Sequence, residues 1–248
     1  GRHVLSEVLP CETMAQAVEL TIRVLEGLSY LHGQAETLIH NDITARNIMY
    51  DCVGDALLRP RIIDMGHLSH PVMGRPDFQT SDLELCYRAP ETFIGIYSKL
   101  SDLFSVGVLL YEMIYGCLPW SCDASKSPSE AREELREARK AGLRFPEKEP
   151  EGMTEQLHKV LQRALALDRD RFGSADEFIG ALRGEEVKMP PPKRESAAPP
   201  SANGDVTTDG EQRGGEAEGE APRATFAKGE GNGFADVAGM EELKQLLR

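Results

Sequence analysis

At 248 residues, the chain has room for one or two domains. Its formal net charge of −13 argues against general binding to nucleic acid or to an anionic membrane surface. The five cysteines are scattered and form no Cys-x-x-Cys pair, which argues against a zinc site or a disulfide framework and favours a reducing cytoplasm. No apolar run approaches the roughly 20 residues that a membrane helix needs, and no signal peptide is visible. We therefore expect a cytoplasmic globular protein with no nucleic acid or membrane partner.

The first predicted element is a long amphipathic helix over residues 12–32. Apolar residues recur there at helical spacing: Val18, Ile22, Leu25, Leu28 and Leu31. Three short runs follow, "LIH" (38–40), "NIMY" (47–50) and "RIID" (61–64), and their β-branched residues predict short strands.

The second half of the globular part is predicted to be helical. Residues 101–116 are apolar on nearly all sides, so we expect this helix in the middle of the domain. Residues 130–141 predict a charged helix in solvent, and residues 155–167 and 174–183 predict the closing helices. Ser174, with Glu177 three positions later, predicts a capping box. The fold class is therefore mainly α, of the α+β type, with a small strand-and-loop region near the start.

The composition changes after residue 183. Residues 184–232 are rich in Gly, Pro, Glu and Ala and nearly free of large apolar side chains, so they cannot bury enough surface to offset the entropy of ordering. Residues 233–248 become apolar and helical again, either as the start of a further domain or as an amphipathic capping helix. We expect a domain over 1–183, a disordered linker over 184–232 and a second domain that begins at 233.

A polar cluster lies in the strand-and-loop region, in "HNDITARN" (40–47). Asp42 and Asn47 flank a loop between two short strands, and Asp64 follows the next strand in "IIDMG". Such oxygen-bearing side chains at strand ends suit a hard cation such as Mg²⁺ and a hydroxyl nucleophile. Each residue alone has an ordinary explanation, because Asp and Asn commonly form turns and caps. The ordered set favours a functional site.

The order of these motifs resembles the signature of protein kinases. His-x-Asp-x-x-x-x-Asn is found as "HNDITARN" (40–47), Asp-x-Gly as "DMG" (64–66), and Ala-Pro-Glu within "YRAPE" (87–91). Residues 101–120 look like the buried helix that follows the activation segment, and "DRDRFGSADEFIGAL" (168–182) looks like the closing pattern of eukaryotic-like, bacterial-type serine/threonine kinases. The resemblance implies a protein-kinase C-terminal lobe with a small β-hairpin catalytic region.

The resemblance also implies roles for the matching residues. Asp42 would be the base that accepts the proton of the substrate hydroxyl, and Arg46 would face phosphate. Asn47 and Asp64 would hold Mg²⁺ on the ATP phosphates, so that Asp42 and Asn47 face hydroxyl and metal from opposite ends of one loop. The structural matches are His40, Met65 and Gly66 in packing or turn positions, Glu91 with Arg171 as a buried ion pair, and Asp102 as the acceptor for the catalytic-loop backbone. The implied cofactors are ATP and Mg²⁺, and the implied partner is a protein substrate.

Three positions depart from the family pattern. Asn41 replaces the usual Arg, so no cation is present there to receive a phosphate from the activation loop. Met65 replaces Phe, and its flexible apolar side chain should still pack. Thr44 replaces the Lys typical of serine/threonine kinases, and "TARN" is closer to tyrosine kinases. The resemblance favours Ser or Thr over Tyr, but these residues leave the acceptor hydroxyl open.

The front of the kinase pattern is missing from the sequence. The chain has no Gly-x-Gly-x-x-Gly loop and no Val-Ala-x-Lys strand, so we expect the N-terminal lobe to be absent from these residues. Either the chain is a fragment of a complete kinase or a degenerate kinase kept only its helical lobe. In both cases we expect residues 1–248 alone not to transfer phosphate.

The final stretch, "GFADVAGMEELKQLLR" (233–248), resembles the opening of an AAA+ ATPase module. The matching residues are Phe234, Asp236, Val237, Gly239 and Lys244. This resemblance implies self-association through that module. Two functions therefore remain open: an ATP- and Mg²⁺-dependent protein kinase, or a pseudokinase that regulates or recruits partners for an attached ATPase.

Overall fold

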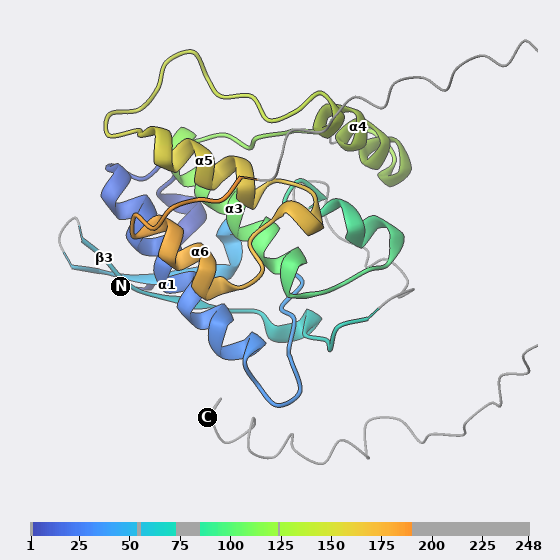
Figure 1. Cartoon of the computed structure of the whole chain (residues 1–248), viewed down its shortest axis with the longest axis horizontal. Coiled ribbons are helices and arrows are strands. Elements are labelled where there is room, and N and C mark those ends of the chain that lie inside the picture. The colour runs from blue at the N-terminus through green and yellow to red at the C-terminus, as the bar shows by residue number, and fades with distance from the viewer. Residues whose placement is uncertain (1, 54–55, 73–84, 124, 190–248) are drawn as a thin grey trace, which may run out of the picture. The chain divides into compact units, whose positions relative to one another are not determined.

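The structure is a computed structural model that describes residues 2–53, 56–72, 85–123 and 125–189. These residues form a helix-rich fold with one small three-stranded sheet, which confirms the expected mainly α architecture (Figure 1). Within the described ranges, no helix has both the length and the apolar character to cross a membrane. Most of the expected linker (184–232) and all of the AAA+-like stretch (233–248) lie outside the described residues.

The sheet has the strand order β1-β2-β3, with antiparallel neighbours. Strand β2 (Ile48–Val53) pairs with β3 (Ala56–Ile62), which confirms the expected hairpin beside the polar loop. The register shifts between the pairs made by Met49 and Asp51. Strand β1 (Arg2–Val4) was not predicted, because three residues are too few to show an alternating pattern.

Helix α1 (Met14–His32) lies between the sheet and the other helices and contacts β3, α3 and α6 (Figure 1). Thr13 and Gln16 form a capping box at its start. Because these two side chains satisfy exposed backbone N–H groups, the helix begins two residues later than the predicted residue 12. Of the predicted apolar face, Ile22, Leu25 and Leu28 are buried, and Val18 and Leu31 pack partly buried against the core.

Helix α3 (Lys99–Tyr115) is the buried centre of the domain, as predicted. Ser98 and Ser101 cap its first turn, and nearly all of its side chains are buried. A Cβ atom at Gly107 would lie 2.8 Å from the Cβ of Ala164, so glycine permits the close approach of α3 to α5 (Glu155–Ala164).

Helix α4 (Pro128–Lys140) carries the expected row of charges, but it is not solvated on all sides. Leu135 is fully buried, and the guanidinium of Arg139 lies 5.1 Å from the ring centre of Phe104. The expectation of a helix that only faces solvent was therefore wrong. Charged side chains with long apolar stems can cover apolar surface, which the sequence pattern does not reveal.

Helix α6 (Ala175–Leu182) begins at Ser174, whose hydroxyl accepts the Glu177 N–H at 3.1 Å. The predicted capping box is only half formed. The Glu177 carboxylate accepts the Gly173 N–H at 2.7 Å and pairs with Arg163, because that guanidinium lies within reach on α5.

The packed region continues past Arg183, where we expected the linker to begin. Val187 is 7 % exposed and belongs to the hydrophobic core. The side-chain amide of Gln156 donates to the Glu185 carbonyl at 2.7 Å. Residues 184–189 are mostly polar, so their composition does not indicate that Val187 is buried.

Candidate active site

A buried carboxylate fixes the loop that carries Asp42. Asp102, in the first turn of α3, is 1 % exposed and accepts the backbone N–H groups of His40 and Asn41, each at 2.8 Å. Its Oδ2 also accepts from Nε2 of His32 at 2.9 Å. Three donors compensate the burial of this charge. The predicted contact between Asp102 and the loop backbone is therefore present, and His32 is an additional partner.

Asn41 fastens this loop to the segment that follows "DMG". Its φ of 69° lies in the left-handed region, which Asn tolerates better than most residues. Its side-chain amide lies 2.7 Å from the His67 carbonyl and 2.9 Å from the Ser69 hydroxyl. Ile39 and Ser69 form a β-bridge beside it. Asn41 thus has a structural task at the position where the family usually has a cation.

Asp42 and Asn47 are in direct contact. The amide Nδ2 of Asn47 donates to the Asp42 carbonyl at 2.9 Å and to its carboxylate Oδ2 at 2.7 Å. The two side chains therefore lie side by side, and the expectation that Asp42 faces the substrate hydroxyl and Asn47 the metal stays a prediction. Both side chains are held together, because the polypeptide turns back through Ala45–Asn47. Since Nδ2 faces Asp42, the carbonyl Oδ1 of Asn47 is directed to the other side.

The backbone brings Asp64 to the same place. The N–H of Ile63 donates to the carbonyl of Asn47 at 2.9 Å. Asp64 follows with φ 60° and ψ 75°, a left-handed conformation that is costly for a residue with a Cβ. Its Oδ1 accepts the Gly66 N–H at 3.2 Å, and its side chain is exposed. The strained turn thus follows directly on a residue whose backbone is bonded to Asn47, and it leaves the Asp64 carboxylate exposed.

Two side-chain oxygens of this region are of the kind that bind Mg²⁺ on a nucleotide. Mg²⁺ usually takes one or two protein oxygens and completes its octahedral shell with water and phosphate oxygens. The carboxylate of Asp64 and the Oδ1 of Asn47 are of this type. Arg46, which directly precedes Asn47 in the sequence, is exposed. Asn47 and Asp64 are therefore the residues that would hold a magnesium ion bound to the nucleotide phosphates.

His40 and Met65 differ in their packing. His40 is fully buried, as predicted, and its Nδ1 accepts the Asp42 N–H at 3.3 Å. Burial lowers the pKa of His40, although the Asp102 and Asp42 carboxylates oppose the shift. Met65 is only half-buried and lies outside the main hydrophobic cluster, so its expected packing is incomplete. The reason is its place in a short turn between the exposed residues Asp64 and Gly66.

The ion pair predicted between Glu91 and Arg171 is present. Nη1 of Arg171 lies 2.7 Å from Oε1 of Glu91, and the two side chains are 0 % and 10 % exposed. Arg171 also donates to the carbonyls of Leu100 and Ala166, at 2.6 and 3.0 Å. It therefore joins the turn Pro90–Ile94 to α3 and to the end of α5.

A second set of contacts around "YRAPE" (87–91) has no counterpart among the predicted residues. The Tyr87 hydroxyl donates to the Glu112 carboxylate. Burial raises the pKa of Tyr87 and also that of Glu112, so the tyrosine keeps its proton. Arg88 donates to the Tyr97 hydroxyl at 2.9 Å. These side chains meet only through the fold, and no local pattern marks them.

Comparisons with known proteins find similar sequences among protein kinases. A probable serine/threonine-protein kinase of Dictyostelium discoideum is 29 % identical over 72 % of this chain and 33 % of its own length. The megakaryocyte-associated tyrosine-protein kinase of Rattus norvegicus is 34 % identical over 48 % of this chain and 24 % of its own length. The chain thus spans a third or less of these relatives.

A solved kinase structure shares the fold of this chain, and a family model matches residues 4–180. The Cydia pomonella granulovirus kinase PK-1 shares the fold, with a TM-score of 0.56 and 22 % identity over 71 % of this chain and 63 % of its own. The family model described as "Protein kinase domain" matches residues 4–180. The chain belongs to the protein kinase family.

Proposed function

We propose that the protein containing this chain transfers the γ-phosphoryl group of ATP to a hydroxyl group of a protein substrate. One observation carries the proposal: the Asn47 amide holds the Asp42 carboxylate at 2.7 Å, in a loop fixed by the buried Asp102. A scaffold has no need for an oriented carboxylate beside Asn47 and Asp64. Serine or threonine is the favoured acceptor, because several relatives are named serine/threonine kinases.

In this proposal, the residues of the chain would have the following roles in phosphoryl transfer. Asp42 accepts the proton of the attacking hydroxyl, and the Asn47 amide keeps its carboxylate in position. Asn47 Oδ1 and Asp64 hold Mg²⁺, and Arg46 faces phosphate. The cofactors supply the phosphoryl group and neutralise the charge that develops on it. Glu91, Arg171 and Asp102 hold the surrounding segments still.

We extend the proposal to the rest of the chain. Residues 1–183 with their short continuation form the helical lobe, residues up to 232 form a flexible linker, and residues 233–248 begin an AAA+ ATPase module that brings copies of the protein together. The low apolar content of the linker and the matches at Phe234 and Gly239 support this organisation. Among the described residues, the thiols of Cys86 and Cys122 lie 3.7 Å apart without a disulfide bond, which is compatible with the reducing cytoplasm that we propose.

The alternative is a pseudokinase module that binds partners. It is favoured by Asn41, which has only structural contacts, and by the half-buried Met65. Residues 1–248 contain no Gly-rich loop or Val-Ala-x-Lys strand to clamp the nucleotide, so we propose that they do not transfer phosphate alone.

The test uses the whole protein that contains these residues, with labelled ATP and a generic protein substrate. Transfer should require Mg²⁺ and should be lost in Asp64→Ala, because a metal ligand is removed. Asp170→Ala, away from the proposed site, serves as the control. Absence of transfer in the wild type would favour the pseudokinase, and equal rates in wild type and Asp64→Ala would contradict the role of Asp64 as a metal ligand.

A further inference from the structure

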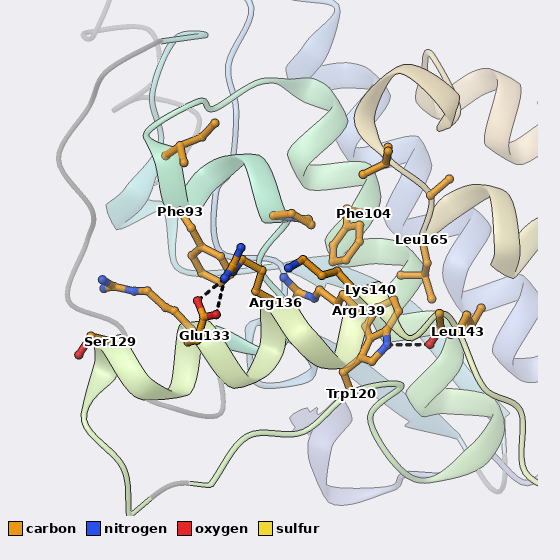
Figure 2. Close-up of a pocket in the computed structure, with 16 residues that line it drawn as sticks. Phe93, Phe104, Trp120, Ser129, Glu133, Arg136, Arg139, Lys140, Leu143 and Leu165 are labelled. Atoms are coloured by element: carbon orange, nitrogen blue, oxygen red, sulfur yellow. Dashed lines mark hydrogen bonds and ion pairs between the residues drawn. The ribbon is translucent and has the colours of Figure 1, made fainter. Parts of the chain in front are cut away.

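A cavity of about 630 Å³ lies between α4, the turn Pro90–Ile94 and the residues that follow α5 (Figure 2). Its lining does not include Asp42, Asn47 or Asp64. The walls are largely apolar and include Phe93, Phe104, Trp120, Leu143 and Leu165. Two large apolar side chains at its edge are exposed to solvent, Ile94 by 73 % and Leu167 by 44 %. Exposed apolar surface around a cavity is typical of a binding site.

Basic side chains of α4 border this apolar surface. Arg132, Arg136 and Lys140 follow one another at four-residue intervals, so they share one face of the helix. Figure 2 shows Arg136, Arg139 and Lys140 on the side of α4 that faces Phe93 and Phe104. Four basic side chains line the cavity against one acidic side chain, Glu133, whereas the whole chain has a net charge of −13. The site is therefore a local basic patch on an acidic protein.

The surface ion pairs of this face do not block it. Arg136 pairs with Glu133 and Lys140 pairs with Glu137, and all four side chains are 57 % exposed. Exposed pairs of this kind contribute little, typically up to about 1 kcal/mol. A ligand carboxylate can therefore replace either acidic partner at small cost.

Arg139 supplies a second, independent observation. Its Nη2 donates to the carbonyls of Cys86 and Arg88, at 3.1 and 2.8 Å. Its Nε and Nη1 are buried and have no hydrogen-bond partner among the described residues. The guanidinium lies 5.5 Å from the ring centre of Trp120 and 5.6 Å from that of Phe93. Burial lowers its pKa to about 10, so it stays charged at neutral pH. The aromatic rings enclose these donors, so Arg139 acts on a ligand through its charge, which adds to the positive potential of the cavity wall and favours an anionic group.

We propose that this cavity docks a partner protein through a segment in which a large apolar side chain lies next to an Asp or Glu. The aromatic walls would take the apolar side chain, while the exposed Arg136 and Lys140 on α4 would take the carboxylate. A nucleic acid fits less well, since it offers no aliphatic anchor and the acidic protein repels a polyanion. This docking goes beyond phosphoryl transfer and does not depend on it.

The experiment selects a phage-displayed random peptide library against the full 248-residue chain. Selected peptides should combine Asp or Glu with Leu, Ile, Met or Phe. Their affinity, measured by fluorescence anisotropy, should fall about tenfold or more when Arg136→Glu and Lys140→Glu are combined, because like charges then meet at the interface. Ile94→Asp should also weaken binding. Both variants change exposed residues, so circular dichroism should show an intact fold.

The matched control combines Arg23→Glu and Lys159→Glu. These are exposed cations on α1 and α5, each paired with a glutamate of its own helix. Affinity should remain unchanged in this control. The proposal is overturned if no peptides are enriched, if the enriched peptides lack acidic residues, or if Arg136→Glu with Lys140→Glu binds them as tightly as the control does.

The selected peptides and further variants also test two other occupants of the cavity. If peptides bind only after Phe234→Ser and Leu243→Ser, the cavity is occupied by residues 233–248 of the chain itself. If light scattering shows a dimer that Ile94→Asp dissociates, the occupant is a second copy. Either result overturns the proposal of a separate partner protein.

Discussion

The buried pair of Glu91 and Arg171 should be essential for the stability of the domain. In Arg171→Ala, the Glu91 carboxylate loses its cation, and the carbonyls of Leu100 and Ala166 lose their donors. The missing side chain also leaves a void beside Phe104, whose ring centre lies 4.8 Å from the guanidinium carbon. Removing one partner of a buried pair costs about 3–5 kcal/mol, a large share of the roughly 5–15 kcal/mol that stabilises a domain.

The assay is urea denaturation followed by circular dichroism. With a slope of about 1–3 kcal/mol per molar urea, the midpoint should fall by at least about 1 M, or the variant should not fold. Arg169→Ala is the control: this arginine is 70 % exposed and lies 3.8 Å from Asp170, so its loss should change stability by less than about 0.5 kcal/mol. Equal stability of Arg171→Ala and Arg169→Ala would show that the Glu91–Arg171 ion pair is not essential for stability.

Three further predictions concern the loop around Asp42. Asp102→Asn leaves one carbonyl oxygen to accept from His40, Asn41 and His32. Urea denaturation should therefore show a free energy of unfolding that is lower by about 1–3 kcal/mol. An unchanged midpoint contradicts the role of this carboxylate. Because burial lowers the pKa of His40, the unfolded chain binds more protons near its normal pKa of 6.5. The unfolding free energy should therefore be constant above pH 7 and fall below pH 6.5 by at most about 1.4 kcal/mol per unit, and His40→Gln should reduce that slope. Asn47→Ala should lower the transfer rate about tenfold or more and raise the Mg²⁺ concentration needed for half-maximal transfer; unaltered Mg²⁺ dependence would argue against Asn47 as a metal ligand.

The parts of the fold that the sequence predicts well are those specified by local patterns. Apolar periodicity identifies α1 and α3, and the order of the kinase motifs predicts that Glu91 meets Arg171 across 80 positions of sequence. The contact of Asp102 with the loop backbone follows from the same resemblance. In each case, either the spacing of residues or a known motif order carries the information.

Other features depend on side-chain geometry that no pattern records. The proximity of His32 to Asp102 requires the end of α1 to meet the start of α3, and a histidine at a helix end is common for other reasons. Arg139 belongs to a row of charges that predicts solvent exposure, yet aromatic rings from distant segments cover it. The amide of Asn47 lies on Asp42 only because the turn between them closes tightly.

A single-turnover comparison of the wild type with Asp42→Asn tests whether Asp42 is the general base, because it separates the rate of phosphoryl transfer from nucleotide affinity. In the whole protein, this change keeps the shape of the side chain and removes its ability to accept a proton. Loss of a general base typically costs about 10²–10⁴ in rate. We predict a fall of about a hundredfold or more in single-turnover transfer, with unchanged affinity for ADP and Mg²⁺ and an unchanged urea midpoint. Equal transfer rates in Asp42→Asn and the wild type would contradict the assignment of Asp42 as the base.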